Sequence, residues 1–295
     1  MNKLHVLRYG EIGTKGRRVR NSFESILIDN IERTFLKENQ EVIIDRKRGR
    51  LYAYCDEDSA YLFSRVFGLV SYSPAEEISS DMDDIKEKSK NFGRDKEGSF
   101  AVRATRTGRH DYSSPQLEAE VGAAVLKENP DLDVDLEDPD NTLHIEVRNN
   151  RAYIFTEIYP CPGGLPLGCQ GKIAGYLEDE NDFIAIWMMM KRGARVYIFR
   201  SDDKDDKLYD RLDRWDPNLK IVGEGTKEDF FAKNFSENIK GLVIGQTLDD
   251  IFETDNGNGS QKNEGGLPVF RPLIGFTDER IIDHLKKVED LEHPG

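Results

Sequence analysis

The stretch from Ser99 to Lys172 decides the fold of this chain. It reads SFAVRATRTGRHDYSSPQLEAEVGAAVLKENP over residues 99–130, LDVDLEDPDNTLHIEVRNNRAYIFTEI over 132–158 and YPCPGGLPLGCQGK over 159–172. A strand-like run at its start is followed by apolar residues at helical spacing from Leu117 to Val125, with Pro115 before them. Two further strand-like runs cover 142–147 and 152–158. The stretch therefore predicts a compact α+β unit.

Cationic side chains gather at the end of the first strand of this unit and in the turn after it. They are Arg103, Arg106, Arg109 and His110. Cations at one strand end are typical of a domain that reads the RNA backbone. On composition alone, an ordinary solvated surface that carries arginine is an equally good interpretation.

The order of the residues helps to choose between these two interpretations. The pattern VRATRTG…SSPQLEAEVGAAV…VDLEDPD…HIEVRNNRAYIFTE…PGGLPLG…GK resembles the THUMP domain of the tRNA 4-thiouridine synthetase (tRNA sulfurtransferase) family, with its join to an ATP-using domain. The resemblance implies that tRNA is a partner and that the acceptor-stem shape and single-stranded 3′ end are recognised. It does not by itself imply that this chain performs the family's chemistry.

Composition sets limits on the function. The net charge of −14 argues against a protein covered in phosphate-binding surface. The first 50 residues nevertheless carry more Lys and Arg than Asp and Glu, so a local basic face is compatible with RNA binding. No apolar run approaches the roughly 20 residues of a membrane helix, and the N-terminus MNKLHVLRYG has no signal-peptide core. A cytoplasmic protein without membrane contact is expected.

The three cysteines, Cys55, Cys161 and Cys169, are too few and too irregular for a disulfide framework. Cys161 and Cys169 flank the PGGLPLG connector and could pair or share a metal ion. Because no histidine lies nearby in the sequence, incidental thiols are the favoured interpretation, and no metal site is predicted.

Residues 1–75 predict a ferredoxin-like domain, because their pattern has the split order β-α-β-β-α-β. The expected elements are a strand over Leu4–Tyr9, a helix from about Asn21 to Lys37, strands over Val42–Ile44 and Leu51–Tyr54, a short helix over Ala60–Phe67 and a strand over Leu69–Tyr72. The very basic turn RKRGR, residues 46–50, joins the second and third strands.

The first loop of this domain, RYGEIGTKGRRVRNSFE, covers residues 8–24. Its cations are Lys15, Arg17, Arg18 and Arg20. Guanidinium groups and the exposed N–H groups of a following helix together suit phosphate, although a solvated basic loop is the alternative. RYGEI..KG...R..FE resembles the N-terminal signature of the same family, which favours RNA contact. The glycine spacing G-x-x-G-x-x-G does not fit a dinucleotide fingerprint.

Residues 76–165 are expected to form the THUMP domain, with a helix over 78–90 before the opening stretch, and residues 166–295 an α/β domain. In the last segment, strand-like and helix-like runs alternate, with helices expected over 183–192, 230–239 and 277–288. GGLPLG.QGK, MMMKRGARV, GLVIGQTL and GGLPVFRPLIGFTDERII resemble the family's ATP-pyrophosphatase (PP-loop) domain, in the same order. The fold class is therefore α+β and α/β.

The nucleotide loop of that domain is degenerate in this chain. The family's Ser-Gly-Gly-x-Asp-Ser loop falls on Leu177, Glu178, Asp179, Glu180, Asn181 and Asp182, and no specified residue is kept. Glycines that let a phosphate approach the backbone are replaced by carboxylates that repel it. Asp249, Asp250 and Thr254 replace further family residues, and no sulfur-relay cysteine follows the last helix. The sequence therefore predicts no catalytic residues and no cofactor.

Three functions stay open at this point. The first is a tRNA-binding protein without adenylation or sulfur transfer, which serves a separate tRNA-modifying enzyme. The second is an active tRNA sulfurtransferase that uses ATP and Mg²⁺ through a divergent site, or receives sulfur from a partner. The third is an interaction protein that does not bind RNA. The expected RNA-binding residues are Lys15, Arg17, Arg18, Arg20, Arg103, Arg106, Arg109, His110 and Lys172. The family's tendency to pair makes a homodimer the expectation.

Overall fold

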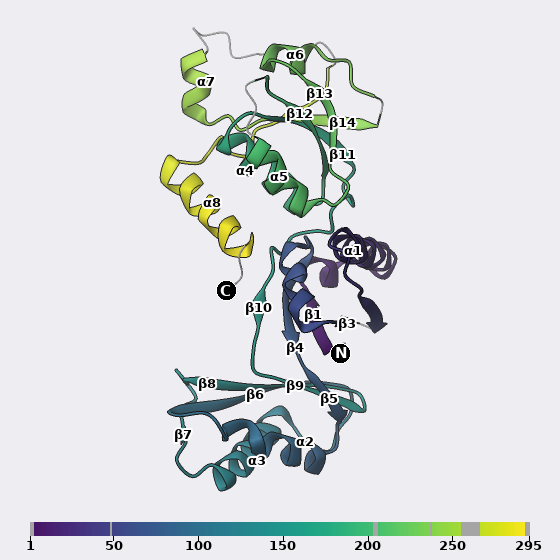
Figure 1. Cartoon of the computed structure of the whole chain (residues 1–295). Coiled ribbons are helices and arrows are strands. Elements are labelled where there is room, and N and C mark those ends of the chain that lie inside the picture. Colours follow the sequence, from purple (N-terminus) through teal and green to yellow (C-terminus); the bar gives the residue numbers. More distant parts are fainter. Residues whose placement is uncertain (1–2, 48, 203–205, 237, 255–265, 293–295) are drawn as a thin grey trace.

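The computed structural model describes residues 3–47, 49–202, 206–236, 238–254 and 266–292, which contain three separate sheets (Figure 1). The first domain lies in the middle of the molecule, with the second domain at one end and the third at the other. The chain thus begins in the middle, passes to one end, and crosses the first domain again to reach the other end. No helix among the described residues is long and apolar enough to cross a membrane.

The first domain has the predicted order β-α-β-β-α-β, except that a 3-10 helix (labelled η) takes the place of the second α-helix. Its elements are β1 (Lys3–Tyr9), η1 (Glu11–Thr14), α1 (Arg17–Lys37), β2 (Ile43–Lys47), β3 (Arg50–Cys55), η2 (Glu57–Arg65) and β4 (Leu69–Pro74). The sheet order is β10-β4-β1-β3-β2, where β10 (Tyr159–Pro160) comes from the connector to the third domain. Leu27, Ile31 and Phe35 recur one helical turn apart and bury one side of α1 in the core of this domain.

Two local predictions for the first domain are corrected. The helix begins at Arg17 rather than near Asn21, because Gly16 is extended and arginine is a good helix former, so the three arginines of the loop belong to the helix. The basic RKRGR segment is mostly strand, since Arg46 and Lys47 end β2 and Arg50 begins β3. Arg48 lies outside the described residues.

The second domain is a five-stranded sheet with helices on one face (Figure 1). Its elements are β5 (Glu76–Ser79), α2 (Met82–Ser89), η3 (Lys90–Gly93), β6 (Ser99–Thr107), α3 (Ser114–Glu128), β7 (Asp133–Val134), β8 (Asn141–Arg148) and β9 (Arg151–Phe155). The helix predicted to begin at Ile78 is wrong there, because residues 76–79 pair with β9 and the helix begins only after its N-cap, Asp81. Ser113 and Gln116 form a capping box that starts α3.

The third domain is a parallel sheet with strand order β13-β12-β11-β14-β15. Its elements are β11 (Lys172–Leu177), α4 (Glu180–Lys191), β12 (Arg195–Arg200), α5 (Asp206–Trp215), β13 (Lys220–Glu224), α6 (Lys227–Ala232), β14 (Ile239–Val243), α7 (Leu248–Thr254), β15 (Val269–Phe270) and α8 (Asp278–Glu292). The helix predicted over 230–239 is wrong in position, because the capping box of Thr226 and Asp229 starts it earlier. The α7 helix was not predicted.

The first and third domains share an apolar core. Phe67 of the first domain packs against Trp187 and Trp215, at ring-centroid distances of 5.4 and 5.2 Å. At the edge of this contact, the Ser64 hydroxyl donates a hydrogen bond to the carbonyl of Leu291 in α8 at 3.1 Å. The third domain is therefore held to the first by buried aromatic rings as well as by polar contacts.

Candidate nucleic-acid interface

Four basic side chains of the first domain surround one cavity. Arg17 and Arg20 come from the first turns of α1, and Arg46 and Lys47 come from the end of β2. This cavity, which we call the α1–β2 cavity, has a volume of about 400 Å³; Asn21, Glu24 and Gly49 also line it. Gly16, the N-cap of α1, has no side chain to accept hydrogen bonds from the first N–H groups of the helix. These N–H groups can therefore interact favourably with an anion in the cavity.

Glu24 organises this cavity. Its side chain is 5% exposed; it accepts a hydrogen bond from the Tyr9 hydroxyl at 2.5 Å and pairs with Arg46 at 2.5 Å and Arg20 at 4.0 Å. Burial, together with the contact to Glu24, raises the pKa of Tyr9 above its ordinary value. One carboxylate thus fixes two guanidinium groups, and the lining keeps an excess of positive charge.

Sequence reasoning missed Arg46 and Lys47 as site residues, although it noted the basic turn to which they belong. The missing information was the pairing of β2 with β3, which places the turn beside the N-terminal end of α1. The other predicted cations of this domain are placed differently. Arg18 is exposed on α1, and Lys15 ends η1 near Cys169 of the connector.

In the second domain, Arg106 and His110 are neighbours and Arg103 is apart from them. The Arg106 guanidinium lies 3.5 Å from Nδ1 of His110, whose Nε2 lies 2.5 Å from the carbonyl oxygen of Asn149. Arg103 donates a hydrogen bond to the carbonyl of Leu136. Side chains alternate along a strand, so Arg103 and Arg106 leave opposite faces of β6. Arg109 is exposed in the turn that follows.

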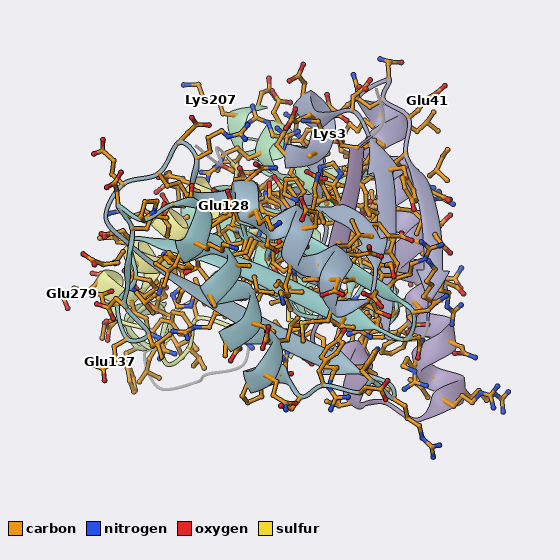
Figure 2. All side chains as sticks on the ribbon, turned by 90° about the horizontal axis from the view of Figure 1, so that it is seen from below. Lys3, Glu41, Glu128, Glu137, Lys207 and Glu279 are labelled. Atoms are coloured by element: carbon orange, nitrogen blue, oxygen red, sulfur yellow. The ribbon has the colours of Figure 1, made fainter. Side chains whose placement is uncertain are left out.

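The basic residues of the two domains meet at the β2–β3 turn. A Cβ built on Gly49, which lines the α1–β2 cavity, would lie 3.7 Å from the guanidinium of Arg148 in β8. Arg148 is the register partner of Thr107, the residue after Arg106. Arg148 therefore leaves the face of the second sheet that meets the first domain, whereas Arg106 leaves the opposite face, so cations of the two domains reach the same end of this sheet from both of its faces. Elsewhere acidic side chains project outward, as Glu137 and Glu279 do at the margin of the molecule (Figure 2).

A carboxylate at the contact between the two domains is surrounded by three arginines. Glu146 of β8 lies 2.8 Å from Nε of Arg50, 2.5 Å from Nε of Arg148 and 3.8 Å from Nε of Arg8. Burial favours its neutral form, but Arg50 and Arg148 outweigh burial and hold the pKa of Glu146 below its ordinary value. The carboxylate is therefore ionised at neutral pH.

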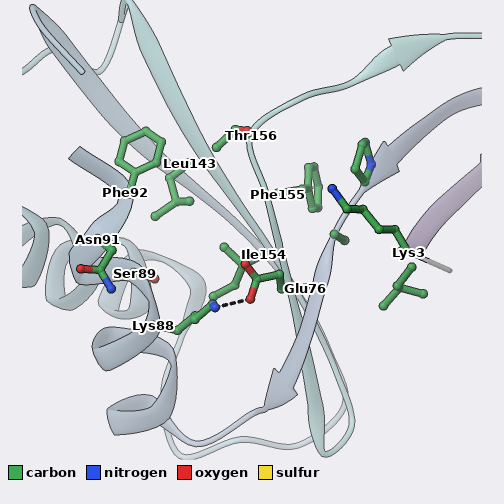
Figure 3. A pocket seen from close by; sticks show the side chains of 13 residues that line it. Lys3, Glu76, Lys88, Ser89, Asn91, Phe92, Leu143, Ile154, Phe155 and Thr156 are labelled. Carbon is green, nitrogen blue, oxygen red and sulfur yellow. Dashed lines mark ion pairs between the residues drawn. The ribbon is translucent and has the colours of Figure 1, made fainter. Parts of the chain in front are cut away.

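A second cavity lies on another side of the same two domains (Figure 3). It has a volume of about 570 Å³, and Phe92, Leu143, Ile154 and Phe155 form its apolar wall. An ion pair between Lys88 and Glu76 stands at its edge. None of the RNA-binding residues predicted from the sequence lines this cavity.

Residues 177–182, predicted from the sequence to be a degenerate nucleotide loop, lie where the third sheet changes direction. β11 is the central strand; the chain continues to β12 on one side and later returns to β14 on the other. In such sheets, ligands bind beyond the carboxyl ends of the two strands that flank this point. Leu177 ends β11, and Glu180 begins α4. The structure therefore places the loop at the expected position.

Carboxylates of the chain itself satisfy the N–H groups around this loop. Asp179 caps α4 by accepting a hydrogen bond from the N–H of Asp182 at 2.9 Å. Asp182, 3% exposed, accepts hydrogen bonds from the N–H of Glu178 at 3.2 Å and of Gly245 at 2.7 Å. Burial, together with the nearby charge of Asp179, raises the pKa of Asp182 to about 7. The N–H groups of Glu178, Asp182 and Gly245 thus already have acceptors within the chain.

The side chain of Glu178 makes further hydrogen bonds at the same edge of the sheet. It accepts hydrogen bonds from the hydroxyls of Ser201 at 3.0 Å and Tyr176 at 3.3 Å, and Lys227 lies 4.0 Å away. The side chain of Asp250, a further departure from the family pattern, caps α7 through Thr247. These acidic residues therefore have structural contacts within the third domain.

The remaining residues predicted from the sequence lie away from the α1–β2 cavity and from the loop of residues 177–182. Lys172 begins β11, at the end of the strand opposite the loop, with its ammonium 5.6 Å from the centre of the Tyr197 ring. Cys55, Cys161 and Cys169 are free thiols. Within the part of the chain that the structure describes, no group of three or more His, Cys, Asp or Glu side chains could hold a metal ion.

Comparison with known proteins identifies the first two domains. The family described as the ThiI ferredoxin-like domain matches residues 4–73, and the family described as the THUMP domain matches residues 79–157. Both domain types were predicted from the sequence, and both predictions are confirmed.

Two solved structures are similar over the whole chain. PH1313 from Pyrococcus horikoshii is 30% identical, with a TM-score of 0.78 over 98% of this chain and 100% of that one. A 4-thiouridine synthetase, solved as an RNA complex with bound ATP, is 22% identical, with a TM-score of 0.73 over 100% of this chain and 87% of that one. The second similarity bears on the fold alone and confirms a third domain of the PP-loop type.

Relatives of known family cover almost the whole chain. A probable tRNA sulfurtransferase of Thermococcus kodakarensis is 31% identical over 97% of this chain and 88% of the relative. Another, from Methanobrevibacter smithii, is 34% identical over 94% of this chain and 84% of the relative. The first alignment has 339 positions, whereas this chain has 295 residues. The relative therefore has residues within the aligned region that this chain lacks. These similarities show that the chain belongs to the tRNA sulfurtransferase family.

Proposed function

We propose that the chain binds the acceptor end of tRNA with a basic surface shared by its first two domains. The observation that carries this proposal is the position of Gly49, which lines the α1–β2 cavity and whose added Cβ would lie 3.7 Å from the Arg148 guanidinium of the second domain. A-form RNA is recognised mainly through its phosphates, its 2′-hydroxyls and its unpaired ends. Guanidinium groups spread over two rigid domains suit the backbone of a stem better than a single base.

The comparisons support tRNA as the partner. The second domain matches the THUMP family, and a protein with a similar fold was solved as an RNA complex. Within this surface we assign phosphate and sugar contacts to Arg17, Arg20 and Arg106, and we add Arg46 and Lys47. Arg18, Arg103, Arg109 and His110 extend the surface, whereas Lys15 and Lys172 lie toward the third domain.

We further propose that the third domain does not adenylate RNA through the usual nucleotide loop. Support comes from Asp179 and Asp182, whose carboxylates accept hydrogen bonds from the N–H groups of Asp182, Glu178 and Gly245. An incoming triphosphate would have to displace these carboxyl groups and would meet the negative charge of Asp179 and, above a pH of about 7, that of Asp182. The chain would then bind tRNA for a separate tRNA-modifying enzyme, as a monomer or as a homodimer.

An active tRNA sulfurtransferase is the second candidate. It is favoured by relatives of that name which match this chain over almost all of its length. In this case ATP and Mg²⁺ would bind at a divergent site, or a partner would supply the sulfur. Binding of ATP separates the two candidates, because only the second requires it.

Charge reversal on each domain tests the tRNA proposal. We expect Arg17→Glu and Arg106→Glu each to weaken binding of a tRNA acceptor-stem minihelix about tenfold or more, and to make binding less dependent on salt. Lys127→Glu, on an exposed position of α3, is the matched control and should leave the affinity within about twofold. Equal affinities for all four proteins, or binding that does not weaken as salt rises, would contradict the proposal.

A further inference from the structure

The contact between the first two domains is unbalanced in charge. Arg8 and Arg50 come from the first domain, Arg148 comes from the second, and Glu146 is the carboxylate that all three approach. The side chain of Glu146 is 6% exposed, whereas those of the arginines are 17 to 22% exposed. Three guanidinium groups therefore share one buried carboxylate across the domain boundary.

The contacts around this carboxylate are specific. Arg50 also donates to Glu146 through Nη2 at 3.4 Å, while Arg8 donates to Ser73 at 2.9 Å and covers the ring of Phe155 at 4.6 Å. Beside them, the rings of Tyr52 and Tyr153 stack across the same boundary at 4.5 Å, within an apolar cluster that includes Leu4 and Val6. The open face of the second sheet is thus fitted to the first sheet by one charge centre and one aromatic pair.

This contact lies between the two groups of basic residues that the proposed RNA surface combines. The basic residues of the proposed RNA surface belong to both domains, and Arg50 and Arg148 connect the two groups. The spacing of phosphates along an RNA stem is fixed, so both groups can engage it only if the domains keep one orientation. Removal of the carboxylate would leave three cations facing one another at low exposure, which favours separation of the domains.

We propose that Glu146 is a positioning residue that holds the first two domains in the orientation required for one RNA stem to contact both. This inference rests on the proposed tRNA binding, but its structural part can be measured without RNA. The Glu146 side chain is 6% exposed, so under this proposal its loss weakens RNA binding through the geometry of the two domains.

The sign of the effect distinguishes positioning from simple electrostatics. Glu146→Gln removes a negative charge beside three arginines, so an effect of charge alone would tighten the binding of a polyanion. If Glu146 acts by positioning, the same substitution should weaken minihelix binding tenfold or more. Binding of a short duplex that reaches only the α1–β2 cavity should change by less than about twofold. Tyr153→Leu, which keeps the charge, should act in the same direction and provides a second variant if Glu146→Gln folds poorly.

Glu120→Gln is the matched control, because Glu120 lies on α3 of the second domain and pairs with Lys86 of the same domain at 2.9 Å. The experiment measures both RNA affinities and the radius of gyration by small-angle scattering for all four proteins. We expect a larger radius of gyration and selective loss of minihelix binding in Glu146→Gln and Tyr153→Leu only. Unchanged scattering, or tighter minihelix binding by Glu146→Gln, would overturn the inference. Failure of the unmodified chain to bind any RNA would overturn the proposed function, while scattering would still decide the role of Glu146.

Discussion

The carboxylate of Asp182 lies 2.7 Å from the backbone nitrogen of Gly245 and accepts its hydrogen bond. This contact joins the loops after β11 and β14, the two strands between which a parallel sheet of this order receives its ligand. A Cβ on Gly245 would lie 2.3 Å from the backbone of Asn181 and Asp182. The two loops are thus packed directly against each other in the third domain.

Substitution of Gly245 should be costly. In Gly245→Ala the new methyl group would force the loops apart, with a loss of about 2–3 kcal/mol in the free energy of unfolding. Gly122→Ala is the control, because nothing lies within 4 Å of a Cβ at that helical position, and alanine there should stabilise by roughly 0.5–1 kcal/mol. Urea denaturation measures both values. Equal stability of the two variants would contradict the packing described here.

Asp182 should make stability depend on pH between about 4 and 7, the pKa values of its unfolded and folded states. Its folded-state pKa of about 7 lies above the ordinary value of 3.8, so the folded chain binds this proton more tightly than the unfolded chain. The resulting stability is fully present below the unfolded pKa and is lost as the pH rises through 7. Denaturation at several pH values should give a shallower slope over this range in Asp182→Asn. Identical slopes in both proteins would show that Asp182 titrates normally.

Arg46 should contribute one phosphate contact to RNA binding, although it was not among the residues predicted from sequence. Arg46→Gln should weaken minihelix binding several-fold and should lower the dependence of log affinity on log salt by about one unit or less. Fluorescence titrations from low to moderate salt give both quantities. Lys127→Gln serves as the control with the same loss of charge. A salt dependence unchanged in Arg46→Gln would place the RNA elsewhere.

The aromatic contact between the first and third domains should carry much of the stability of that boundary. Phe67 is 1% exposed, and Phe67→Ala should destabilise by about 3–5 kcal/mol. Phe252→Ala removes the same atoms from a side chain that is 71% exposed, so it should change stability by less than about 0.5 kcal/mol. Thermal unfolding of the two variants compares them directly. Similar midpoints would mean that the third domain unfolds independently of Phe67.

Local patterns predicted most of the strands and helices. The apolar spacing of Leu27, Ile31 and Phe35 identified α1, and Pro115 marked the first turn of α3. The predictions were wrong where a partner strand or a helix cap determines the structure. The sequence pattern of residues 78 and 79 is helical, but both residues pair with β9 as part of β5. The capping box at Thr226 sets the start of α6. Such partners are distant in sequence or depend on side-chain geometry.

The candidate site was predictable only in part. Basic segments near residues 15–20 and 103–110 stand out in the sequence, but the meeting of Arg17 and Arg20 with Arg46 and Lys47 requires the folded sheet. The degenerate loop could be located by counting along the chain. That Asp182 satisfies the N–H of Gly245 could not be predicted, because 63 residues separate the two in sequence. Glu146 gave no signal, since a single carboxylate within a strand is unremarkable until arginines from another domain surround it.

One calorimetric experiment tests the central claim most directly. ATP with Mg²⁺ is titrated into the chain alone and into the chain saturated with tRNA. The account predicts that tRNA binds, with an affinity that falls as salt rises, and that ATP produces no binding heat in either titration. Micromolar ATP binding would contradict the account, because it would mean that the carboxylates of Asp179 and Asp182 do not exclude a triphosphate, and it would make an active tRNA sulfurtransferase the better explanation.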